Sequence, residues 1–132
     1  MNSELCNLSQ KSINHFRMQN RIQIVNAELS TRLDLLQSAD VIIFNNVFDW
    51  FVPIEAQVQL WQAIFKNVKS GTLLVTNPSL EETLEKLPKN DLNIDGKDLR
   101  NWIKPSLPFR SHRLPRSEIE EKCETIKLYQ VQ

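Results

Sequence analysis

The sequence predicts an α/β domain built around a pair of parallel strands. Asp40 to Phe44 is a short run of mostly β-branched apolar residues, which predicts a strand covered on both faces. Beyond Pro53, apolar residues recur at steps of four and three, the pattern of an amphipathic helix, at Ile54, Val58, Trp61, Phe65 and Val68. Gly71 ends this helix, and Thr72 to Thr76 is a second β-rich run. Two strands joined by a helix of this length form a crossover connection between parallel strands.

Polar residues follow both strands at the point where each strand ends. Asn45 and Asn46 follow the first strand, and Asn77 follows the second. In open parallel sheets, ligands bind beyond the carboxyl ends of the strands. The sequence therefore predicts a binding site at this edge of the sheet.

The remaining elements of the first half follow in chain order. Asn2 or Ser3 can cap a helix that extends to about Met18, with apolar residues on one face. Arg21 to Val25 alternates and predicts a strand, and Thr31 to Gln37 predicts one or two helical turns.

In the second half, Ser79 to Glu82 is a capping box that opens a helix from Leu80 to Leu87. Prolines make Lys89 to Arg116 an irregular connection around a helical turn near Leu99 to Ile103, and three of its apolar residues are expected to pack on the sheet: Trp102, Leu107 and Phe109. Ser117 to Lys122 is a short helix or turn, and Thr125 to Val131 alternates as a half-buried strand.

Composition places the chain among globular proteins. Its 132 residues correspond to one domain, with 41% hydrophobic and 24% charged residues. Sixteen basic residues balance sixteen acidic ones, so nucleic acid is not indicated as a partner. The six Lys and Arg residues from Lys97 to Arg116 favour a solvated loop over a polyanion-binding patch.

Cysteine and histidine spacing gives no metal or disulfide site. Cys6 and Cys123 are two isolated cysteines, and His15 and His112 lack ligand spacing, so no metal is expected. Two cysteines, no signal-like segment and no long apolar run predict an intracellular protein, cytoplasmic or nuclear, without a membrane span.

Three segments together resemble a known enzyme superfamily. DVIIFNNVFDWF, KSGTLLVT and NPSLEE are similar to the second half of class I S-adenosylmethionine-dependent methyltransferases. The paired asparagines and Phe48 are most similar to the non-SET histone-lysine methyltransferases of the disruptor-of-telomeric-silencing type, whose signature is Asn-Asn-Phe at the end of the fourth strand. Here Val47 separates the pair from Phe48. The resemblance covers about Glu4 to Leu87.

The resemblance implies a fold and a set of site residues. The fold is a Rossmann-like methyltransferase sheet with helices on both faces, truncated before strand three, whose last strands form a hairpin with the final strand antiparallel to the rest. S-adenosylmethionine would contact Asn26, Ala27 and Asn45, and the catalytic residues would be Asn45, Asn46 and Phe48. Asn26 and Ala27 fit equally well as a plain turn after a strand. Trp50 and Phe51 either wall a channel for a substrate lysine through cation–π attraction or bury the start of the helix.

The parts of the superfamily that hold the methionine end and the ribose are missing from the sequence. The two glycines, Gly71 and Gly96, do not form a glycine-rich loop after a strand, and no acid-terminated second strand precedes the first helix. Residues 1–132 are thus expected to form a single partial domain with an exposed edge on the Asp40 strand.

Two hypotheses about function follow. The first is membership of the methyltransferase family, with N-methylation of a protein lysine in the full-length form and an inactive chain by itself. The second is a non-catalytic interaction module or truncated isoform that associates through the exposed strand edge. Motifs of hydrolases, phosphate-binding loops and zinc enzymes are absent from the sequence.

Overall fold

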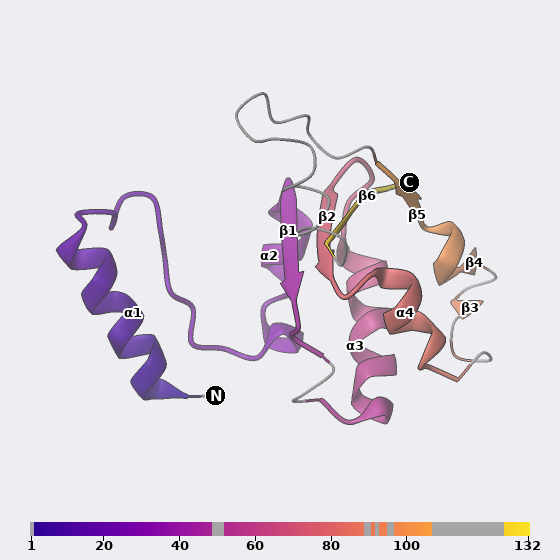
Figure 1. Cartoon of the computed structure of the whole chain (residues 1–132), viewed down its shortest axis with the longest axis horizontal. Coiled ribbons are helices and arrows are strands. Elements are labelled where there is room, and N and C mark those ends of the chain that lie inside the picture. The colour runs from indigo at the N-terminus through magenta and orange to yellow at the C-terminus, as the bar shows by residue number, and fades with distance from the viewer. Residues whose placement is uncertain (1, 49–51, 89–90, 92, 95–96, 107–125) are drawn as a thin grey trace, which may run out of the picture. The chain divides into compact units, whose positions relative to one another are not determined.

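A computed structural model describes residues 2–48, 52–88, 91, 93–94, 97–106 and 126–132. The chain separates into two compact units, Met1–Arg32 and Leu33–Gln132. Figure 1 shows the elements of both units.

The first unit contains one long helix and an irregular segment. Helix α1 (Ser3–His15) is capped by Asn2, whose side chain accepts hydrogen bonds from the backbone N–H groups of Glu4 and Leu5 at 3.0 and 3.2 Å. The predicted helix and its cap are confirmed, although the helix ends three residues early. The chain then passes through turns and coil to a short 3-10 helix, η1 (Leu29–Thr31).

The predicted strand at Arg21 to Val25 is wrong. These residues form a turn followed by irregular chain. A strand is stable only when its backbone groups pair with a neighbour, and the described residues of this unit contain no second strand. The alternation of apolar residues alone was therefore insufficient to form a strand here.

The second unit has the predicted order of helices and strands. Six strands and helices that the sequence indicated are present, with boundaries shifted by one or two residues; they are α2 (Leu33–Ser38), β1 (Val41–Asn45), α3 (Ile54–Asn67), β2 (Leu73–Asn77), α4 (Leu80–Glu85) and β6 (Lys127–Val131). Between α4 and β6 lie β3 (Asn93–Ile94), β4 (Lys97–Asp98), the 3-10 helix η3 (Leu99–Asn101) and β5 (Ile103–Pro105).

The four-stranded sheet has the order β1-β2-β6-β5. β1 and β2 are parallel, with Val41 opposite Leu73 and Asn45 opposite Asn77, as the sequence predicted. β6 is antiparallel to both of its neighbours, which confirms the prediction of an antiparallel last strand. β5 is a strand that the sequence did not predict, in the segment expected to be irregular, whereas β3 and β4 form a separate pair.

One face of the sheet forms the core. Ile42, Leu74 and Tyr129 lie in one row across β1, β2 and β6, and all three are buried. On the opposite face of β1, Val41 and Ile43 are 52% and 66% exposed. The prediction that this strand is covered on both faces is therefore wrong, because β1 is an edge strand that alternates buried and exposed residues.

Trp102, which the sequence predicted to pack on the sheet, is buried and contacts Phe65 of helix α3, with ring centroids 5.4 Å apart. Leu107, Phe109 and the segment 117–122 lie outside the described residues.

Tyr129 connects β6 to the start of α4. Its hydroxyl accepts a hydrogen bond from the backbone N–H of Leu80 at 3.1 Å and donates one to the carboxylate of Glu81. Ser79 caps the helix by accepting from the N–H of Glu82 at 3.2 Å, as predicted. Burial and the bond to Glu81 raise the pKa of Tyr129 and outweigh the Leu80 N–H, which lowers it.

Candidate functional site

Three asparagines meet where the parallel strands end. The Nδ2 atom of Asn77 donates to Oδ1 of Asn45 at 2.9 Å, and Nδ2 of Asn46 donates to the same oxygen at 3.3 Å. The backbone N–H of Asn46 donates to the carbonyl of Asn77 at 2.6 Å. The prediction that these residues lie together at one edge of the sheet is confirmed, and we call them the amide cluster.

The hydrogen bonds of the amide cluster define which of its atoms remain available. Oδ1 of Asn45 already accepts two bonds, so this oxygen is occupied. Within the part of the chain that the structure describes, no donor reaches Oδ1 of Asn46 or of Asn77. The cluster therefore presents acceptors from Asn46 and Asn77, which Asn45 positions.

Asn46 also has a structural reason for its identity. Its φ of +52° lies in the left-handed region, where asparagine is tolerated better than most residues with a side chain. The backbone turns there to leave β1 and enter the loop before α3. The backbone conformation therefore accounts for an asparagine at this position whether or not a ligand binds there.

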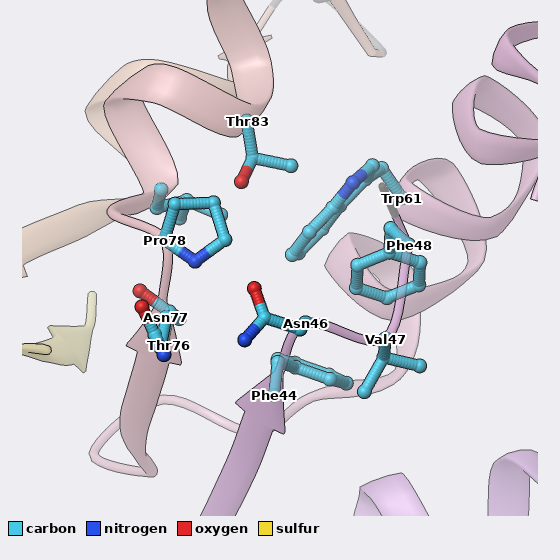
Figure 2. A pocket seen from close by; sticks show the side chains of 10 residues that line it. Phe44, Asn46, Val47, Phe48, Trp61, Thr76, Asn77, Pro78 and Thr83 are labelled. Atoms are coloured by element: carbon cyan, nitrogen blue, oxygen red, sulfur yellow. The ribbon is translucent and has the colours of Figure 1, made fainter. Parts of the chain in front are cut away.

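A small cavity lies beside the amide cluster (Figure 2). Its polar wall includes Asn46 and Asn77, and its apolar wall includes Phe48, Trp61 and Pro78. Figure 2 shows the carboxamide of Asn46 pointing into the space between Pro78 and Trp61. About 10 Å³ is open to the centre of a water molecule, which is room for a single water.

Three aromatic rings form the inner wall. The centroid of Phe48 lies 5.3 Å from that of Phe44 and 4.8 Å from that of Trp61, within the range of favourable aromatic contacts. Phe48 is only 4% exposed, so it belongs to the core as much as to the site. Nε1 of Trp61 is buried without a hydrogen-bond partner among the described residues.

Gln57 is a site residue that the sequence analysis missed. Its Nε2 atom donates to the carbonyls of Phe48 and Val52, at 3.3 and 2.8 Å, from within α3. These bonds hold both ends of the loop that follows β1. A signal was present in the sequence, since Gln57 is a polar residue beside Val58 on the apolar stripe of the helix.

The other predicted site residues belong to the first unit or lie outside the described residues. Asn26 is exposed and Ala27 is half-buried in the irregular segment of the first unit. Trp50 and Phe51 lie outside the described residues.

The site does not fit S-adenosylmethionine. Pockets for ligands of this size enclose roughly 300–1,000 Å³, whereas this cavity has room for about one water. Gly71 has a φ of +89° after α3, but no atom lies within 4 Å of a Cβ placed there, so it forms no close cradle. In the described part of the chain, no three side chains of His, Cys, Asp or Glu group as metal ligands, and no helix is long and apolar enough to cross a membrane.

No family model, curated protein or solved structure matches this chain. The geometry of the amide cluster and of the sheet therefore carries the functional interpretation.

Proposed function

We propose that this chain is the substrate-side half of a methyltransferase-type α/β domain. The reaction would be N-methylation of a protein lysine in a longer form or complex that supplies the S-adenosylmethionine-binding half. Residues 1–132 alone would not catalyse it. The observation that carries the proposal is the meeting of Asn45, Asn46 and Asn77 beyond the carboxyl ends of two parallel strands.

The sheet supports the proposal through its last strands. β6 is antiparallel to β2 and forms a hairpin-like pair with β5, and an antiparallel final strand is what the resemblance implies. β1 lies at the open end of the sheet order, on the side where the first strands of a complete methyltransferase sheet would lie.

The amide cluster can orient an amine without acid–base chemistry. A neutral amine must present its lone pair along one line, and its N–H groups need acceptors at fixed positions. The free carboxamide oxygens of Asn46 and Asn77 are such acceptors, and the two bonds to Asn45 hold the cluster in place. The chain's own contribution is thus to position the acceptor substrate.

A methyl-transfer assay tests the proposal. The protein is isolated from its native source together with its bound partners. S-adenosylmethionine with a labelled methyl group and protein substrates are then added. We expect label on lysine, a loss of about 100-fold in Asn45→Ala because the reactants are misplaced, and no loss in Asn93→Ala, which changes an exposed asparagine of β3. Absence of labelled lysine in the native preparation would refute the proposed function.

A second candidate function, association through the edge of β1, is favoured by a separate observation. Among the described residues, β1 has a strand neighbour on one side only, and its outward residues Val41 and Ile43 are exposed. Edge strands of this kind accept an added strand through main-chain hydrogen bonds. A measurement of mass in solution separates the candidates, since a monomer that transfers methyl groups favours the first and an inactive, associated chain favours the second.

A further inference from the structure

The free edge of β1 has a definite hydrogen-bonding pattern. Asp40 accepts from the N–H of Leu73 at 3.0 Å, and Asn46 donates to the carbonyl of Asn77 at 2.6 Å. Along a strand, successive residues direct their backbone groups to opposite sides, so the even-numbered residues from 40 to 46 face β2. Val41, Ile43 and Asn45 therefore present their N–H and C=O groups to the free edge.

Strand β1 itself, as the structure describes it, carries no residue or bulge of the kind that normally prevents strand addition. Natural edges are protected by Lys, Pro, bulges or inward-pointing charges. Val41–Asn45 contains none of these residues and is regularly paired with β2 along its whole length. Its exposed face adds two large apolar side chains, Val41 and Ile43.

We propose that the occupant of this edge is β1 of a second copy, paired antiparallel about Ile43. Ile43 of one copy would lie opposite Ile43 of the other, and Val41 opposite Asn45, so every outward N–H and C=O finds a partner. The same register places Ile42 opposite Phe44 of the second copy and keeps both on the core face. The inference rests on the second candidate function and names its partner.

Charge and symmetry favour a second copy over a foreign strand. The strand is neutral and has no charged side chain to select an oppositely charged partner. The nearest charge, Asp40, is paired with Lys69 at 2.8 Å, and sixteen basic residues balance sixteen acidic ones, so two copies do not repel one another. Antiparallel pairing about one residue is a closed two-fold arrangement, which stops at a dimer.

Solution mass tests the proposal on the complete chain. We expect a dimer of twice 15.4 kDa that dissociates on dilution below about 100 μM, as suits a small interface. Ile43→Lys places two like charges at the two-fold axis and should halve the mass. Ile43→Pro removes only the outward N–H and should do the same, because proline is tolerated on a free edge.

Ile54 supplies matched controls. It is 48% exposed at the first position of α3, where proline is tolerated, so Ile54→Lys and Ile54→Pro should stay dimeric. Circular dichroism of each variant verifies folding. As a second readout, Ile43→Cys in a Cys6→Ser, Cys123→Ser background should form a disulfide between copies, and Ile54→Cys should not.

Three results would overturn the proposal. They are a wild-type chain that stays monomeric above about 100 μM, a dimer unchanged by both Ile43→Lys and Ile43→Pro, and a mass that grows without limit, which indicates open-ended pairing. The second of these would leave association by another surface standing. Failure of this register is therefore distinguishable from failure of the candidate function.

Discussion

Removal of one hydroxyl group, in Tyr129→Phe, should destabilise the second unit by about 1–3 kcal/mol. Tyr129 is 2% exposed, and its hydroxyl is the acceptor for the N–H of Leu80, itself 1% exposed. Without the hydroxyl, this N–H is buried and unpaired, which sets the magnitude. Glu81 is exposed and regains water when its bond to the hydroxyl is lost, so it adds little.

The same residue predicts a dependence of stability on pH. The pKa of Tyr129 is raised in the folded chain, so the unfolded chain releases this proton first as the pH rises. The stabilisation is complete below about pH 10, the ordinary value for tyrosine, and is lost above it at about 1.4 kcal/mol per pH unit until the folded group also titrates. Tyr129→Phe should lack this contribution, and a comparison of the two chains removes the common effect of lysines.

Two measurements check these expectations. Urea unfolding, followed by circular dichroism, gives the free energy of unfolding of both chains at neutral and at alkaline pH. Because Tyr129 is the sole tyrosine of the sequence, ultraviolet absorbance of tyrosinate reports its titration directly. A destabilisation below about 0.5 kcal/mol, within the range of ordinary surface substitutions, or a tyrosine that titrates near its usual pKa, would refute the reasoning.

Three further predictions concern the amide cluster, the cofactor and an exposed ion pair. Asn46→Ala should cost about 1–2 kcal/mol of unfolding free energy, because alanine is strained at a φ of +52°, whereas Asn46→Gly should cost less; equal losses in urea unfolding would contradict this reason. Calorimetry of residues 1–132 with micromolar S-adenosylmethionine should detect no binding. A micromolar dissociation constant would show that the site is not built as the family resemblance implies. Hydrogen bonds from the side chain and the backbone N–H of Arg100 lower the pKa of Asp98 to about 2, so in NMR titration Arg100→Ala, which keeps the backbone N–H, should raise this pKa part of the way to its ordinary value; an unchanged value would exclude the Arg100 side chain as a cause.

The sequence by itself determined the central crossover and the amide cluster. Apolar runs at 40–44 and 72–76 are too short for helices, and the stripe from Ile54 to Val68 has the period of one, so β1, α3 and β2 follow from local pattern. Once two strands are parallel, their carboxyl ends must share an edge, which brings Asn45 and Asn77 together.

Tertiary structure decided what local pattern could not. Arg21 to Val25 alternates like a strand but pairs with none of the described strands, whereas Ile103–Pro105 contains a proline and still forms β5, because β6 lies beside it. The burial of Phe48 and the hydrogen bonds of Gln57 could not be foreseen from the sequence. Phe48 is buried by packing against Trp61. Gln57 stabilises the loop after β1 because its side chain donates to two carbonyls of that loop. Strand pairing and burial depend on residues distant in the chain, so they could not be determined from local patterns alone.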